Sequence, residues 1–220
     1  MNDSKARALV WRLHELSMRV LKRIVGLHLF RVELGDDRLD ISPPELAPGY
    51  ETKIADPLDL LKWATTETGL TSAFLQSSAK RGDRCVINVF NEQLVGYGFI
   101  AQSRAPVTDQ IEVRVSSKLI YRYKGWTHPE HRRKHLSHAR GRLNKQLFFV
   151  KGGSHTVSYV ETHNHAARAN HPDVHPRLIG YCGFIRFAGR EYPFNLCIRT
   201  HGFCMVRTGT HHDERRENQR

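Results

Sequence analysis

The chain has 220 residues, 40% of them hydrophobic and 25% charged, which is enough to bury a core and is typical of one globular domain. No run of 18 or more apolar residues occurs, which excludes a membrane-spanning helix. The formal net charge of +12 at pH 7 predicts an anionic partner, such as nucleic acid, anionic lipid, a nucleotide-like cofactor or an acidic protein.

The N-terminal segment, residues 1–34, predicts a long amphipathic helix followed by a short strand. Ser4 is a suitable N-cap and Gly26 ends the helix. Apolar residues recur at steps of three and four, at Leu9, Leu13, Leu16, Val20, Ile24 and Leu27. Such a stripe usually packs on its own domain and leaves the basic face in water. A docking surface for a membrane or a partner protein is the alternative, in an otherwise cytoplasmic protein.

Residues 50–127 predict the first part of a mixed α/β domain. We expect a strand at 50–55, a helix at 56–66, a helix at 71–80, a hairpin of 85–90 with 94–102, and one or two strands within 111–127. Gly96 and Gly98 fall inside the second strand of the hairpin. Glycines at such positions indicate a bulge or the close approach of another group to the backbone.

Residues 119–149 hold the most informative pattern: an apolar run, a turn rich in cations, and a helix from Leu136 to about Phe149. The turn contains Arg132, Arg133 and Lys134. A strand, a tight turn and a helix N-terminus together point backbone N–H groups and the positive end of a helix dipole at one place. The segment therefore predicts a phosphate site, most naturally for the pyrophosphate of a nucleotide-like cofactor.

The last part of the chain predicts a strand at 155–161, a short helix at 164–170, closing strands within 181–187 and 193–207, and a disordered polar tail at 208–220. Helices thus come first, then a central antiparallel sheet, one crossover helix and the closing strands. This order favours a mixed α/β fold.

These pieces, in this order, resemble the GNAT superfamily of acyl-CoA-dependent N-acyltransferases over residues 50–207. The motifs that carry the resemblance are Val95-Gly96-Tyr97, the run from Gly125 to Arg132, Asn164 with Ala166-Ala167, and Cys182-Gly183-Phe184. The resemblance implies a mostly antiparallel, twisted sheet flanked by helices, to which the N-terminal helix is added. The family loop usually reads R/Q-x-x-G-x-G/A, whereas His135 stands here at the first glycine. A Cβ at that position would hinder close approach of the pyrophosphate. Either the added cations offset the loss, or the loop is degenerate and inactive.

The resemblance also implies a reaction and its residues. An acetyl or longer acyl group would pass from acetyl-CoA or another acyl-CoA to a primary amine by direct attack. The acyl group and pantetheine would lie along Gly125, Trp126 and Thr127, and Asn164 would bind the pantetheine arm or order water near the sulfur. The pyrophosphate would be held and neutralised by the loop residues Arg132, Arg133, Lys134, His135, Leu136 and Ser137.

The residues that would move protons are less clearly marked. Glu161 and His163 are candidate general bases at the end of a predicted strand, and each has a plain surface role as its alternative. Many family members use a tyrosine as a general acid, and its position would fall near Ile179. Tyr181, two positions later, is the nearest candidate.

Other functional classes are less well supported by the sequence. Histidines occur in two groups, but neither has H-E-x-x-H or a cysteine pair, so no metal is expected. The four cysteines lack C-x-x-C spacing, which favours reduced thiols. Basic residues with interleaved aromatics make a nucleic-acid-binding module the main rival, without a recognised motif to support it. An acidic acyl carrier protein is an alternative donor to coenzyme A, with the N-terminal extension walling a longer acyl chain.

Overall fold

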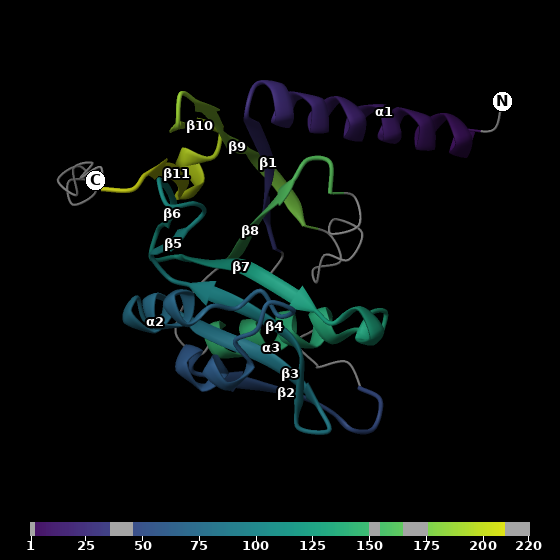
Figure 1. The fold of residues 1–220 in the computed structure, drawn as a ribbon, viewed down its shortest axis with the longest axis vertical. Coiled ribbons are helices and arrows are strands. Elements are labelled where there is room, and N and C mark those ends of the chain that lie inside the picture. The colour runs from purple at the N-terminus through teal and green to yellow at the C-terminus, as the bar shows by residue number, and fades with distance from the viewer. Residues whose placement is uncertain (1–2, 36–45, 150–154, 165–175, 210–220) are drawn as a thin grey trace.

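The computed structural model describes residues 3–35, 46–149, 155–164 and 176–209 (Figure 1). Its elements, in chain order, are α1 (Asp3–Ile24), β1 (Leu27–Leu34), β2 (Tyr50–Ala55), the 3-10 helix η1 (Pro57–Trp63), α2 (Ser72–Lys80), β3 (Arg84–Phe90), β4 (Gln93–Ala101), β5 (Arg104–Pro106), β6 (Ile111–Val115), β7 (Leu119–Thr127), η2 (Pro129–His131), α3 (Leu136–Phe149), β8 (His155–Glu161), β9 (Arg177–Phe187), β10 (Arg190–Leu196), η3 (Arg199–His201) and β11 (Phe203–Arg207). Among the described residues, no helix combines the length and hydropathy needed to cross a membrane.

The strands form an eight-stranded sheet in the order β10-β9-β1-β8-β7-β4-β3-β2 and a three-stranded sheet in the order β11-β6-β5. Every neighbouring pair in both sheets is antiparallel except β7 and β8, which are parallel. The expected mixed α/β fold with a mostly antiparallel sheet flanked by helices is therefore confirmed.

The two faces of the sheet are covered by different elements. On one face, Leu60 of η1 and Leu75 of α2 pack with Ile87 and Phe99 in one core cluster. Side chains alternate along a strand, so Gly96 and Gly98 of β4 lie on the other face, where Arg140 of α3 lies over them. The three-stranded sheet packs against the remaining half of the main sheet in a second cluster, which includes Phe30, Val32, Tyr121, Phe184, Phe203 and Met205.

The N-terminal strand β1 lies inside the main sheet. It pairs with β8 on one side, where Phe30 is opposite Glu161, and with β9 on the other, where Phe30 is opposite Cys182. Val32 is fully buried. The strand expected at 27–34 is thus present, and it completes the sheet between two strands that lie more than 120 residues further along the chain.

The expectation that the apolar stripe of the N-terminal helix packs on the body of the domain is wrong. Leu9, Leu13, Leu16, Val20 and Ile24 are all exposed on α1, whereas Met18 on another side of the helix is buried. The helix itself begins and ends close to the predicted residues, with Gly26 in a left-handed conformation (φ +66°) just after it.

Most other helices and strands lie close to the residues at which capping and turn residues predicted them. The segment predicted as a helix at 56–66 is the 3-10 helix η1, which a capping box between Asp56 and Asp59 starts and which ends at Trp63. Thr71 caps α2 by accepting a hydrogen bond from the Phe74 N–H at 3.2 Å. Residues 111–127 form two strands. The helix predicted at 164–170 and the tail from 210 onward lie outside the described residues.

Candidate active site

Strands β7 and β8 separate after a short paired stretch. Their pairing covers three residues of β7, Leu119 to Tyr121. Further on, β7 stays with β4 as far as Thr127, and β8 stays with β1 as far as Glu161. Figure 1 shows the two strands diverging. Because they are parallel, the ends of both strands, at Thr127 and Glu161, lie on the side toward which the sheet opens.

Within the described residues, the separation leaves the second half of β7 without a strand partner on the side of β8. The His128 N–H donates to the Val95 carbonyl of β4 at 2.9 Å. Successive N–H groups in a strand point to opposite edges, so the Thr127 N–H points to the edge that β8 has left. An N–H group in this position can polarise a carbonyl that enters between the strands.

Two bulges bend the strands next to this opening. In β4, Asn88 is opposite Gly96 while Val89 is opposite Leu94, so Val95 is the extra residue. In β7, Tyr97 is opposite Trp126 while Phe99 is opposite Tyr123, so Lys124 and Gly125 together face Gly98. Lys124 has a positive φ of 46°. The bulge inferred from the glycines of β4 is present, and a second bulge in β7 redirects the end of that strand.

Arg140 of α3 is buried directly behind the end of β7. Its guanidinium donates to Asn88 Oδ1 and, at 3.0 Å, to Thr127 Oγ1. Burial lowers the pKa of Arg140 to about 10, so the side chain stays protonated at neutral pH. The two glycines of β4 provide the space, because a Cβ at Gly96 would lie closer than 3.0 Å to the guanidinium. Sequence reasoning missed Arg140, and the Gly-x-Gly spacing was the available signal.

The loop before α3 contains two left-handed residues, Arg133 (φ 64°) and His135 (φ 57°). Left-handed residues are one component of the concave turns whose N–H groups bind anions. Helix α3 begins at once, with the His135 carbonyl accepting from the Ala139 N–H at 3.0 Å. Leu136 is buried, so its side chain belongs to the core, and the first-turn N–H groups of the helix lack intrahelical partners.

The cations of the loop point in different directions. Lys134 Nζ donates to the Tyr50 hydroxyl at 2.6 Å, and the same hydroxyl lies 2.7 Å from His131 Nδ1. Lys134 is therefore held against β2. Arg132 Nε donates to the Thr127 carbonyl at 3.4 Å, which places it at the end of β7. Arg133 is exposed. Desolvation and the neighbouring Lys134 charge lower the pKa of His131.

Glu161, His163 and Asn164 come together in one turn at the end of β8. Glu161 accepts from Lys22 Nζ of α1 at 2.8 Å and lies 3.3 Å from His163 Nε2. The Asn164 N–H donates to the Glu161 carbonyl at 2.9 Å. His163 Nδ1 is buried and has no hydrogen-bond partner within the described part of the chain. The carboxylate thus lies between an ammonium and an imidazole, an arrangement that can relay a proton.

Tyr181 lies on the opposite face of the sheet from Glu161. Phe30 is the cross-strand partner of both Glu161 and Cys182, so those two side chains share its face. Tyr181 precedes Cys182 in β9 and therefore points the other way. The structure brings two of the three candidate proton carriers together and separates the third.

A second histidine–carboxylate pair lies at the end of β7. His128 Nε2 is 2.9 Å from Glu67 Oε1, which belongs to the segment between η1 and α2. The Trp126 ring meets the His128 ring edge-on and stacks on Tyr97, which directs the indole into the core. Glu67 carried no sequence signal, because 61 residues separate it from His128.

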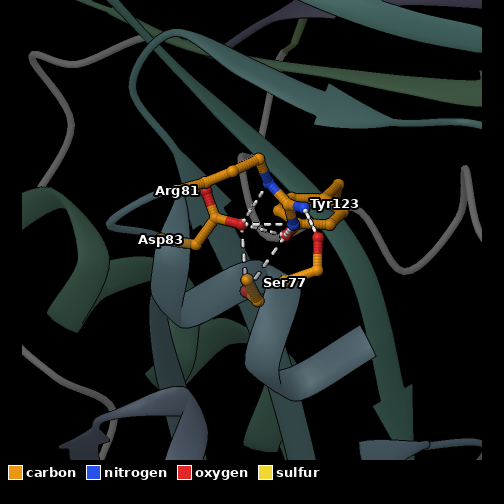
Figure 2. A network of polar contacts seen from close by, with 5 residues as sticks. Ser77, Arg81, Asp83 and Tyr123 are labelled. Carbon is orange, nitrogen blue, oxygen red and sulfur yellow. Dashed lines mark hydrogen bonds and ion pairs between the residues drawn. The ribbon is translucent and has the colours of Figure 1, made fainter. Parts of the chain in front are cut away.

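A buried carboxylate holds β7 just before its bulge (Figure 2). Asp83 Oδ2 accepts from the Tyr123 hydroxyl and Arg81 Nη2, both at 2.6 Å, and from the Ser78 hydroxyl at 2.9 Å. Burial and the Asp83 charge raise the pKa of Tyr123 well above its ordinary value. The network ties the end of α2 to the residue that precedes Lys124 and Gly125.

Two other features lie apart from this site. A hollow of about 720 Å³ at the β2 edge of the sheet is lined by Glu51, Lys53, Lys62 and Trp63, among others, and by no predicted site residue. Within the described ranges, no three His, Cys, Asp or Glu side chains are grouped as metal ligands. All four cysteines are free thiols.

No family model and no curated protein sequence matches the chain. Solved structures match its fold. A tandem GNAT protein from the clavulanic acid biosynthesis pathway aligns with a TM-score of 0.50 and 16% identity over 87% of this chain and 58% of its own. A GCN5-related N-acetyltransferase-like protein from Streptococcus suis aligns with a TM-score of 0.50 and 11% identity over 74% of this chain and 64% of its own. A Drosophila protein aligns with a TM-score of 0.53 and 9% identity over 80% of this chain and 57% of its own.

The chain therefore has the fold of the GNAT superfamily, as its motifs suggested. Each of these alignments spans less than two thirds of the matched protein.

Proposed function

We propose that the protein is an N-acyltransferase that moves an acetyl or longer acyl group from a coenzyme A thioester to a primary amine. The observation that carries the proposal is the separation of β7 from β8, next to the loop with two left-handed residues that leads into α3. The two features support a donor site in which the edge of β7 that β8 leaves lies next to the N–H groups at the start of α3. A long donor with a diphosphate at one end and an amide-containing arm at the other fits this combination.

The chain's residues would divide the work of holding the donor, which supplies the activated acyl group. The N–H groups from Arg133 to Ser137 would bind the pyrophosphate, and the side chains of Arg132 and Arg133 would neutralise it. Lys134 is held by Tyr50 and would have to leave that contact to take part. The arm would lie along Gly125 to Thr127, with Asn164 on the opposite strand end.

The chemistry needs a neutral amine and a polarised carbonyl. The Thr127 N–H would polarise the thioester carbonyl, and the buried cation of Arg140 behind Thr127 would favour charge on that oxygen. Lys22 would first leave its ion pair with Glu161. Glu161, together with His163, would then accept the proton of the acceptor ammonium. The amine nitrogen then forms a bond to the acyl carbon, the carbon–sulfur bond breaks, and the proton that this nitrogen loses passes to the leaving thiolate.

Binding distinguishes this function from its main rival. We expect coenzyme A to raise the thermal midpoint of the protein and a single-stranded oligonucleotide to leave it unchanged. Stabilisation by the oligonucleotide alone would make the protein a nucleic-acid-binding module instead. Thiol release from acetyl-CoA, a long-chain acyl-CoA and an acyl carrier protein thioester, each with a panel of amines, then identifies the donor. Absence of thiol release with all three donors would contradict acyl transfer.

Variants test the base. Glu161→Gln should lower kcat by about 100-fold and leave coenzyme A binding intact, because the loss concerns proton transfer. Glu92→Gln, an exposed carboxylate in the β3–β4 turn, is the matched control and should retain full activity. If Glu161→Gln keeps its activity and Glu67→Gln loses it, the pair of Glu67 with His128 supplies the base and the role of Glu161 is refuted.

A further inference from the structure

Helix α1 presents a continuous apolar stripe to solvent. The stripe consists of Leu9, Leu13, Leu16, Val20 and Ile24, whose exposed fractions are 58%, 57%, 60%, 46% and 77%. These residues recur at steps of three and four, so they form one face of the helix. Scattered exposed leucines are ordinary, but an ordered apolar stripe of this length marks a docking surface.

The opposite side of α1 attaches the helix to the rest of the protein. Met18 is 7% exposed, and Lys22 Nζ makes an ion pair with Glu161 at 2.8 Å. At about 100° per residue, Met18 and Lys22 lie at least about 120° around the helix from Leu13, Leu16 and Val20. Figure 1 shows α1 extending beyond the sheets. The helix is therefore anchored by one side while the apolar stripe faces outward.

The charge of α1 identifies the surface that it fits. The helix contains six Lys and Arg residues against two Asp and Glu. On a helical projection of about 100° per residue, the stripe occupies about 160–240°. Arg12, Arg19 and Arg23 lie at about 100–140°, along one flank of the stripe. An apolar face with arginines along one flank is the pattern of a helix that lies in the interface of an anionic bilayer.

We propose that α1 docks the protein on the surface of anionic membranes, with the stripe in the acyl-chain boundary and the arginines at the lipid phosphates. A second copy of the chain fits less well. In an antiparallel pair of helices joined along the stripe, the arginine flank of one would meet the same flank of the other, and like charges repel. The proposal is independent of the catalytic function.

Vesicle flotation with the full chain tests the proposal. Phosphatidylcholine vesicles with and without phosphatidylglycerol serve as the two surfaces, each at low and high salt. We expect binding to the vesicles that contain phosphatidylglycerol, a partition coefficient about fivefold lower for each arginine removed in Arg12→Gln and Arg23→Gln, and weaker binding at high salt.

The stripe is tested without a change of charge. The double variant Leu13→Gln with Leu16→Gln should lower the partition coefficient by at least about tenfold, because two apolar side chains no longer enter the bilayer. Phe187→Gln, at a residue 71% exposed on β9, is the matched control and should bind like the unchanged protein. Far-ultraviolet circular dichroism and the thermal midpoint check that each variant is folded.

Three results would overturn the proposal. The first is an absence of binding to phosphatidylglycerol vesicles, and the second is a loss of binding in Phe187→Gln equal to that of the leucine double variant. The third is a dimer, measured by light scattering, that the leucine double variant dissociates while no lipid is bound. The third result would assign the stripe to another copy of the chain.

Discussion

Gly96 and Gly98 lie on the same face of β4, two residues apart, and the structure predicts opposite responses to the same substitution. A Cβ at Gly96 would lie closer than 3.0 Å to Arg140 Nη1, 3.1 Å from Asn88 Oδ1 and 3.3 Å from the Trp126 carbonyl. A Cβ at Gly98 would meet its nearest atom, Arg140 Nε, at 3.6 Å, which is ordinary van der Waals contact.

The magnitudes follow from these contacts. Gly96→Ala overpacks a buried site, which costs about 1–3 kcal/mol, and it displaces the guanidinium from Asn88, where a charged hydrogen bond contributes about 1.5–3 kcal/mol. With partial relaxation we expect the free energy of unfolding to fall by about 2–4 kcal/mol. Gly98→Ala meets no obstacle and should change it by less than about 1 kcal/mol, in the stabilising direction, because alanine restricts the unfolded chain.

Urea denaturation followed by circular dichroism measures both free energies. A double variant, Gly96→Ala with Arg140→Met, adds a check on the mechanism. If the guanidinium is what the new methyl group strikes, the cost of the two changes together is smaller than the sum of their separate costs. Equal effects of the two alanine substitutions, or strict additivity in the double variant, would refute the placement of Arg140 over Gly96.

Three further predictions concern the carboxylate network, the buried thiol and the loop. Asp83→Asn should lower the free energy of unfolding by about 3 kcal/mol, because it removes the buried charge that pairs with the partly buried Arg81 cation. Asp109→Asn, at an exposed residue, should have little effect in the same denaturation assay. Burial raises the pKa of the Cys85 thiol from 9.0 to about 12. As the pH rises, this thiol loses its proton in the unfolded chain before it does so in the folded protein. The free energy of unfolding, measured by denaturation at a series of pH values, should therefore fall above about pH 9, and it should fall less in Cys85→Ala. His135→Gly should stabilise the protein by about 0.5–1 kcal/mol and tighten coenzyme A binding in calorimetry, because it relieves a left-handed residue; if His135→Ala does the same, the imidazole and not the backbone is responsible.

Much of the fold was predictable because its signals are local. The cap at Thr71, the capping box at Asp56 and the glycine after α1 each act on residues next to them in the chain. Strand alternation likewise marked 27–34 and 50–55 as strands. What these signals do not contain is the partner of each strand. Nothing within residues 27–34 specifies that this strand lies between β8 and β9, because the pairing depends on residues more than 120 positions away.

The candidate site was predictable in part for the same reason. The cationic loop, the strand end before it and the turn at Glu161 were found because each is a short run of sequence. Arg140, Tyr50 and Glu67 were missed, since each acts through a partner distant in the chain: Asn88, Lys134 and His128. Tyr181 was chosen by its position in a motif, and only the register of β9 against β1 decides which face it occupies.

The amino-acid sequence by itself determined where most helices and strands begin and end, that residue 135 departs from the glycine of the GNAT loop, and that the N-terminal helix has an apolar stripe. The tertiary structure alone decided which way that stripe faces, which cation is buried behind β7, and where β7 and β8 separate. Periodicity and capping depend on neighbours a few residues apart, whereas burial and strand pairing depend on contacts between segments that only the folded chain brings together.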